Sequence, residues 1–316
     1  MISQNHMKNE IKIFCSEDWV DYELLDTGDG EKLERFGPHT FVRPYEEAVW
    51  SKTLKKEWED VNGKFWSSKS GGKGGLASLK QRGSGWKMSK VPFDTKWEME
   101  YKGIKFLASP TPFRHLGFFP EQATHWDFIE SKIQGLALDK SKARPLKFLN
   151  LFGYTGVASL FALRAGAEVT HVDASKQTLN WAKENQRLNA ELVQGPMRLI
   201  EDDVIKFLER EIKRGNKYDA IVIDPPKFGR GPKGEVWKIE EMLPKLLFLV
   251  QKVLSDKPLF VILTSYATDS SSLSLGYALA ESMTKFKGQT EMGELCVLEK
   301  SNNRMISLAY TAIWVL

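Results

Sequence analysis

The chain has 316 residues, of which 42% are hydrophobic and 27% charged, and its formal net charge is +4. This composition excludes a largely disordered chain and suits one large core or two smaller ones. There is no apolar run long enough to span a bilayer, and the N-terminus lacks the layout of a signal peptide. The two cysteines are far apart in the sequence, which argues against a disulfide framework. We therefore expect a cytoplasmic protein.

The first third of the sequence has the pattern of a β-rich domain. Residues 21–37 form two short runs around a Gly-Asp-Gly turn, and residues 96–109 form two runs around Lys102 and Gly103. Both patterns predict β-hairpins, and residues 39–44 predict a further strand that ends at Pro44.

Charge is unevenly distributed within this part. Residues 1–60 hold 14 acidic residues against 8 Lys and Arg, whereas residues 64–90 hold Lys and Arg but no acid. Trp66 and Trp86 flank the basic segment, and cations beside aromatic rings suit a nucleic-acid strand with unstacked bases. The alternative is a solvated insertion between strands. The candidate RNA-binding residues are Lys64, Lys69, Lys73, Lys80, Arg82 and Lys87.

Residues from 120 onward change to α/β character. Pro120 stands where a helix would begin, and from residue 145 apolar strands alternate with amphipathic helices. That order predicts a Rossmann-like domain with a mostly parallel sheet. The last two apolar runs lie close together, so we expect them to form an antiparallel C-terminal hairpin. The predicted domains are a smaller β-rich domain over 1–110 and the α/β domain over 111–316.

The turn after the first strand of this domain reads Phe-Gly-Tyr-Thr-Gly. Dinucleotide sites require Gly-x-Gly-x-x-Gly so that a pyrophosphate can approach the helix. Here Tyr154 and Thr155 replace the middle glycine; they would crowd a pyrophosphate but not S-adenosylmethionine, which has no phosphate. An acid ends the next strand, where it can hold ribose hydroxyls. We expect cofactor contacts from Phe152, Gly153, Tyr154, Thr155, Gly156, Asp173, Ala174 and Ser175. The alternative is a structural turn with a surface aspartate.

Two acidic segments follow the third and fourth strands. Asp202 and Asp203 can both contact the cofactor; Asp203 is the better acceptor for the adenine amino group, and Asp202 is the candidate cap of the next helix. The second segment is Asp224-Pro225-Pro226, in which the two prolines free the backbone from the sheet. A carbonyl of this segment can then face a substrate, while the carboxylate lies near the cofactor and its reactive methyl group. The catalytic candidates are Asp224, Pro225, Pro226 and Lys227.

The motifs LFGYTG, HVDAS, EDDV and DPPKF together resemble the class I S-adenosylmethionine-dependent methyltransferases of bacterial large-subunit ribosomal RNA. The resemblance covers residues 112–316 and implies methyl transfer from S-adenosyl-L-methionine to ribosomal RNA, alone or in a large-subunit particle. The segment GFFPEQ resembles the family's cofactor-contacting segment before the first motif. It implies contacts from Phe118, Phe119 and Gln122, whereas the alternative for the two phenylalanines is core packing between the domains.

Members of this family make 5-methylcytosine or 7-methylguanine. The former requires a cysteine thiolate that adds to C6 of the base, and in those members it follows the fifth strand. Here that segment, LTSYATDSSS, holds Tyr266 and serines but no cysteine. We therefore expect methylation of a base heteroatom. A ring nitrogen is favoured over an exocyclic amine, because Lys227 rather than an aromatic residue follows the prolines.

Lys227 itself has two interpretations: it contacts a phosphate or the O6 atom of the base, or it is a surface lysine whose stem covers Phe228. For the whole chain, the alternatives are a methyltransferase acting on a small molecule or protein, and a non-catalytic RNA-binding protein with this fold. A nicotinamide oxidoreductase fits least, since Asp-Pro-Pro has no role there. No metal is expected, because the histidines lack further ligands at metal-binding spacing.

Overall fold

The computed structural model describes residues 10–16, 19–66, 85–137, 144–193, 195, 197–266 and 270–316. The chain folds as two compact units. The α/β unit comprises Met1–Cys15, Glu121–Cys296 and Ser307–Leu316, and the β unit comprises Ser16–Pro120 and Val297–Ile306. This division differs from two consecutive domains over 1–110 and 111–316, since each unit also takes a short segment from the other end of the chain.

The described strands of the α/β unit form a sheet in the order β1-β16-β17-β15-β12-β9-β10-β11. Strands β15, β12, β9, β10 and β11 pair in parallel, each with the next, and β1 pairs in parallel with β16. Strand β17 runs antiparallel to β15. The predicted C-terminal hairpin is confirmed, whereas the edge strand β1 was not predicted. The bounds are β1 Ile11–Cys15, β9 Lys147–Leu151, β10 Glu168–Asp173, β11 Arg198–Glu201, β12 Ala220–Ile223, β15 Phe260–Ser265, β16 Gln289–Leu298 and β17 Met305–Val315.

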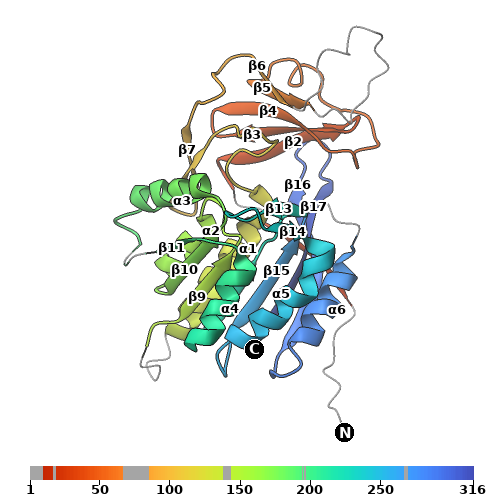
Figure 1. Ribbon diagram of the computed structural model, residues 1–316. Helices are drawn as coiled ribbons and strands as arrows, with labels where there is room; N and C mark the ends of the chain where they lie inside the picture. Colours follow the sequence, from red (N-terminus) through yellow and green to blue (C-terminus); the bar gives the residue numbers. More distant parts are fainter. Residues whose placement is uncertain are drawn as a thin grey trace. The chain divides into compact units, whose positions relative to one another are not determined.

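Helices cover both faces of this sheet, as the alternation predicted (Figure 1). Helices α4, α5 and α6 lie on one face, and α1 and α2 lie on the other. A short 3₁₀ turn, Pro120–Gln122, precedes α1. The bounds are α1 Ala123–Ala137, α2 Val157–Arg164, α3 Lys176–Leu188, α4 Val204–Arg214, α5 Ile239–Val253 and α6 Ser272–Ser282. Among the described residues, none of the helices has the length and apolar character needed to cross a membrane.

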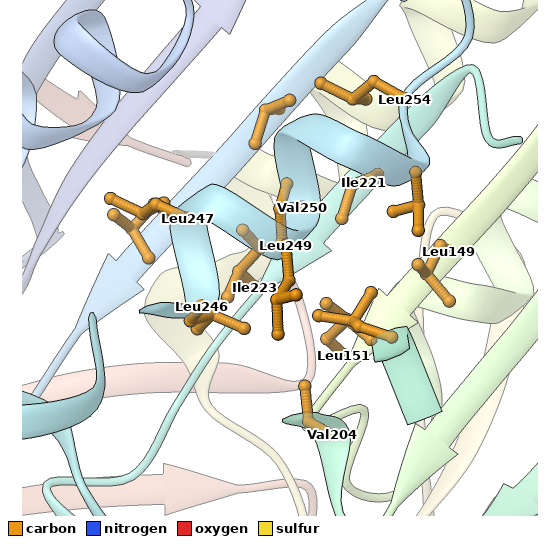
Figure 2. Close-up of a cluster of buried hydrophobic side chains, with 14 of the residues drawn as sticks. Leu149, Leu151, Val204, Ile221, Ile223, Leu246, Leu247, Leu249, Val250 and Leu254 are labelled. Atoms are coloured by element: carbon orange, nitrogen blue, oxygen red, sulfur yellow. The ribbon is translucent and has the colours of Figure 1, made fainter. Parts of the chain in front are cut away.

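The main core lies between α5 and the parallel strands. Figure 2 shows Val250 of α5 among Leu149, Leu151, Ile221 and Ile223 from the central strands, all of which are buried. Both faces of β12 are covered, which explains its uninterrupted apolar sequence AIVI. Truncating one of these leucines to alanine would cost about 2–5 kcal/mol of stability.

The strand order determines where a ligand can bind. From β9 the chain proceeds outward to β10 and β11, and then crosses to β12 on the other side of β9. Ligands of open α/β sheets bind beyond the carboxyl ends of the strands at such a reversal. The turns after these strands contact one another there: Asp224 N donates to Leu151 O at 3.3 Å, and Asp202 N donates to Asp173 O at 3.1 Å.

The described residues of the β unit form two small sheets. In the first, the predicted hairpin of β2 (Tyr22–Gly28) and β3 (Glu31–Phe36) and the predicted strand β4 (His39–Pro44) are confirmed, followed by β5 (Gly63–Trp66) and β6 (Gly85–Met88). The second is the predicted hairpin of β7 (Trp97–Tyr101) and β8 (Ile104–Ala108). A buried carboxylate, Glu34, accepts two hydrogen bonds of 2.6 Å from Arg43. Although burial raises the pKa of Glu34, Arg43 and Lys32 lower it to about 2.

Candidate active site

The turn between β9 and α2 has a backbone that few sequences can adopt. Phe152 and Tyr154 have φ values of 57° and 53°, and Gly156, which precedes α2, has a φ of 85°. Non-glycine residues in this region cost about 1–3 kcal/mol each and are typical of functional sites. At Gly153 a Cβ atom would lie 2.3 Å from Cε1 of His171, which excludes any side chain. His171 packs directly against Gly153 of the turn and is fully buried. Burial lowers the pKa of His171 to about 4, so the imidazole is neutral.

Asp173, at the end of β10, connects this turn with the next one. Its Oδ2 accepts from Tyr154 N at 2.9 Å, and its Oδ1 accepts from Ser175 N and Thr178 Oγ1, both at 2.8 Å. Burial raises the pKa of Asp173 against the effect of these hydrogen bonds. Since Oδ2 has the fewer bonds, it is the oxygen with capacity left for a ribose hydroxyl.

Ser175, next to the predicted contact Ala174, caps α3: its side chain accepts from Thr178 N at 3.3 Å. Of the two aspartates after β11, Asp203 takes the capping role that was expected of Asp202. Asp203 caps α4 by accepting from Lys206 N at 2.9 Å, whereas Asp202 forms an ion pair with Arg210 and accepts from Asp203 N. The expectation that Asp202 is the cap was therefore wrong, because α4 begins at Val204 and the residue directly before it provides the cap.

Asp224 follows β12 and carries an unusual carboxyl group. Its Oδ1 is buried and has no hydrogen-bond partner within the described residues, while its Oδ2 accepts from Gln122 Nε2 at 3.2 Å. Burial and, secondarily, the nearby Glu121 raise the pKa of Asp224 to about 8. The group therefore holds its proton at neutral pH, and its Oδ1 is an unsatisfied polar atom beside the turn that follows β9.

The two prolines after Asp224 differ in their surroundings. Pro225 is buried and Pro226 exposed. The Pro226 carbonyl accepts from Trp237 Nε1 at 2.7 Å. Lys227 is exposed, with Nζ 3.9 Å from Glu240 Oε1. Phe228 is itself 55% exposed, so neither the lysine stem nor any other group covers it fully.

A chain of hydrogen bonds holds Asp224 from the side of α1. Gln122 Nε2 donates to Asp224 and, at 2.8 Å, to the hydroxyl oxygen of Tyr266, which follows β15. Gln122 Oε1 lies 2.7 Å from His125 Nδ1, and His125 Nε2 lies 3.0 Å from Thr311 Oγ1. Because an amide oxygen only accepts, the neutral imidazole donates from Nδ1 and accepts at Nε2. This tautomer fixes the Gln122 amide with its nitrogen toward Asp224.

Four residues in and beside this chain of hydrogen bonds were not predicted as site residues: Glu121, His125, Tyr266 and Thr311. Burial lowers the pKa of His125 to about 3, which keeps it neutral, and burial raises the pKa of Tyr266 well above its usual range. Glu121, buried next to Gln122, also interacts with the Tyr266 hydroxyl. The sequence signal for Tyr266 was its position at the end of the fifth strand, but no sequence pattern connects His125 with Thr311.

The predicted aromatic contacts before α1 lie in the β unit. Phe118 is 2% exposed, and its ring packs 4.9 Å from Phe106 and 5.6 Å from both Trp19 and Phe36. It is therefore a core residue of the β unit, which fits the core-packing alternative, and its cofactor contact stays a prediction. Phe119 is partly exposed, with its ring 4.9 Å from that of His115, and its cofactor contact stays a prediction.

The basic segment is described only at its two ends. Lys64 in β5 pairs with Glu31 at 2.7 Å, and Lys87 in β6 is exposed opposite Lys64. Trp86 is half-buried, donates from Nε1 to two backbone carbonyls and packs against Phe41 of the β unit. Lys69, Lys73, Lys80 and Arg82 lie outside the described residues. The described residues also contain no group of His, Cys, Asp and Glu that could hold a metal ion.

Comparison of the chain with known proteins identifies the family to which it belongs. The family described as S-adenosylmethionine-dependent methyltransferase matches residues 91–255, more than half of the chain. The chain belongs to this family. The crystal structure of an S-adenosylmethionine-dependent methyltransferase from Agrobacterium tumefaciens superimposes with a TM-score of 0.85 at 39% identity, covering 96% of this chain and 93% of that one. A putative methyltransferase from Streptococcus mutans shares the fold, with a TM-score of 0.67 at 17% identity over 95% of this chain and 76% of that one.

Two curated relatives are named for their RNA substrate. Ribosomal RNA large subunit methyltransferase K/L of Pseudoalteromonas atlantica is 33% identical over 145 residues, which is 45% of this chain and 18% of the relative. Ribosomal RNA large subunit methyltransferase I of Aeromonas salmonicida is 34% identical over 131 residues, which is 41% of this chain and 30% of the relative. The aligned segments thus span less than a third of either relative.

The site fits S-adenosylmethionine, the cofactor of this family, whose sulfonium group supplies the methyl to be transferred. Gly153 leaves the turn's backbone edge free of side chains, and Asp173 retains an acceptor site on Oδ2. The buried, unpartnered Oδ1 of Asp224 gives the site a polar atom that a ligand can satisfy. Asp173 ends β10 and Asp224 follows β12, the two strands that flank β9 where the strand order reverses, which is the position expected for a ligand of this fold.

Proposed function

We propose that the enzyme methylates a base heteroatom, and preferentially a ring nitrogen, in ribosomal RNA. Two curated relatives that match this chain at 33–34% identity are named ribosomal RNA large subunit methyltransferases. The observation that carries the choice of atom is the state of Asp224. With a pKa of about 8, this carboxyl is mostly protonated in the cofactor-free protein at neutral pH, so it is set to donate a hydrogen bond rather than to take up a proton. A ring nitrogen with a free lone pair needs no base, only alignment with the methyl group.

Cysteine chemistry on a carbon atom is disfavoured by two further observations. Tyr266 stands at the end of β15, where the resemblance places a nucleophilic cysteine, and its hydroxyl is held by Gln122. Cys296 is buried in β16 next to β1, and burial raises the pKa of its thiol to about 12. A thiol with that pKa supplies almost no thiolate at neutral pH.

The prolines and Asp224 define how the target base would be held. We place Oδ1 of Asp224 and the Pro225 carbonyl toward the base, since Oδ1 has no partner among the described residues and Trp237 already donates to the Pro226 carbonyl. A protonated Asp224 can donate a hydrogen bond from Oδ1, which suits a carbonyl oxygen next to the accepting nitrogen. Gln122 restrains the other carboxyl oxygen and thereby the orientation of the group.

The substrate class is tested with S-adenosylmethionine that carries a tritiated methyl group. Portions of the purified protein receive ribosomal RNA, intact large subunits, transfer RNA or a protein extract, all from a strain lacking this gene. Tritium in ribosomal RNA or in the large subunit's RNA is the expected result. Tritium confined to protein or to small molecules would contradict the proposal, and so would RNA binding without any transfer.

A further inference from the structure

A two-stranded ribbon directly follows the Asp-Pro-Pro segment. Strands β13 (Phe228–Arg230) and β14 (Val236–Lys238) pair antiparallel, with Gly229 opposite Trp237. Because alternate residues of a strand face opposite sides, Gly229 and Trp237 share the inner face of this ribbon. Its outer face carries Phe228, Arg230, Val236 and Lys238.

The inner face attaches the ribbon to the active site. Trp237 is 5% exposed, donates from Nε1 to the Pro226 carbonyl, and places its ring 4.9 Å from that of Phe152 in the turn after β9. Gly229 lies so close to the prolines that a Cβ atom would be 3.3 Å from Pro226 Cγ. The ribbon is therefore positioned by the same two segments that form the methyl-transfer site.

The outer face combines exposed apolar side chains with cations. Phe228 is 55% exposed and Val236 is 53% exposed, although both lie within regular strands. The exposed Arg230, and Lys233 at the ribbon's tip, take part in no ion pair with any described residue. Glu235 is the acid between residues 228 and 238, and it is already paired with Lys206.

Lys238 is less available, since its Nζ lies 2.8 Å from Glu241 Oε1. The cations free to meet an anion are thus Arg230, at the end of β13, and Lys233, within the ribbon's turn. An exposed aromatic ring beside unpaired cations has the chemistry of a surface that binds single-stranded nucleic acid, where rings stack on bases and cations contact phosphates.

We propose that the outer face of the β13–β14 ribbon holds the RNA strand next to the nucleotide that is methylated. Phe228 stacks on an unpaired neighbouring base, while Arg230 and Lys233 contact the adjoining phosphates. The inference rests on the proposed RNA substrate. A base inside a duplex cannot reach Asp224, so the target nucleotide must leave its stack, and its neighbours then expose their faces for stacking. The link from Trp237 to Pro226 sets the distance between this surface and the target base.

The test measures filter binding of protein-free large-subunit ribosomal RNA, taken from a strain lacking the gene, at a series of KCl concentrations. Phe228→Ala should weaken binding about tenfold, since stacking of one base on an aromatic ring contributes about 1–3 kcal/mol. The double variant Arg230→Ala/Lys233→Ala should reduce the slope of log affinity against log salt by about 1.4, the value for two phosphate contacts on a single strand. Calorimetric affinity for S-adenosylmethionine should stay within twofold of the parent in each variant.

The matched control variants change exposed residues on α5 and in the segment that follows it. Phe248 is 57% exposed, and Lys252 and Lys257 are exposed as well. Phe248→Ala and Lys252→Ala/Lys257→Ala remove the same chemistry elsewhere and should leave RNA affinity and its salt slope unchanged. Equal losses in the controls, or undiminished RNA binding by Phe228→Ala and the ribbon double variant, would overturn the ribbon's role while leaving the proposed RNA substrate intact. A parent enzyme that neither binds nor methylates the RNA would overturn both.

Discussion

Replacing Asp224 by asparagine should stabilise the cofactor-free protein, although the residue belongs to the active site. Asparagine has the shape of the protonated carboxyl and can still accept from Gln122, but it never ionises. In the folded protein, burial and Glu121 raise the pKa of Asp224 from 3.8 to about 8. At pH 7 the unfolded chain has therefore lost a proton that the folded chain retains, and this difference favours unfolding.

The size of the effect follows from the pKa difference. Below pH 3.8 both states are protonated and Asp224 imposes no penalty; between 3.8 and about 8 the penalty grows with pH, and above about 8 it is constant. At pH 7 the penalty corresponds to the roughly three pH units by which pH 7 exceeds the unfolded pKa of 3.8, which gives an upper bound of about 4 kcal/mol. Relaxation and water around a partly exposed residue reduce it, so we expect about 1–3 kcal/mol, or a rise in Tm of a few degrees.

The assay is thermal unfolding of parent and Asp224→Asn, followed by circular dichroism at pH values from 4 to 9. The Tm difference should grow with pH up to about 8 and then level off. Asp219→Asn is the matched control with the opposite sign: although burial raises the pKa of Asp219, bonds of 2.7 and 2.8 Å from Arg144 hold it below its usual value. That variant should lose stability at neutral pH. A Tm difference for Asp224→Asn that does not change with pH, or is negative throughout, would refute the reasoning.

Three further predictions concern the turn, the hydrogen-bond chain and the basic segment. Gly153→Ala should lower cofactor affinity at least tenfold in calorimetry and cost about 1–3 kcal/mol of stability, because its Cβ would lie 2.3 Å from His171; Gly135→Ala, with open space in α1, should do neither. His125→Ala should lower kcat about tenfold with little change in KM, since the Gln122 amide loses the donor that orients it. Neutralising three cations together should weaken RNA binding and reduce its salt slope by about 2, with cofactor affinity unchanged. These three are Lys73, Lys80 and Arg82.

Much of the α/β unit could be predicted because its signals are local. The alternation of apolar strands and amphipathic helices determines a parallel sheet, and the carboxyl ends of such strands meet at one edge. Gly153, Asp173 and Asp224 are therefore readable from the sequence as neighbours. Assigning the helix cap to Asp202 failed by one residue, because the cap depends on where α4 begins rather than on composition.

What could not be predicted depends on contacts between distant segments. His125 on α1 meets Thr311 on β17, which lies 186 residues later. Strand β1 pairs with β16 in the same way, across almost the whole chain. Phe118 stands in a segment that resembles a cofactor contact, but the aromatic rings of the β unit surround it. The strands β13 and β14 are three residues each, too short to produce a periodic pattern.

The most direct test of the proposed activity is a nucleoside analysis by mass spectrometry of large-subunit ribosomal RNA from three strains. One strain has the gene, one lacks it, and one carries the Asp224→Ala variant. One methylated nucleoside, with the methyl group on a base nitrogen, should be present in the first strain and absent from the other two, while purified Asp224→Ala still binds S-adenosylmethionine. Identical nucleoside compositions in all three strains, or a lost methyl group that was attached to carbon, would contradict the account.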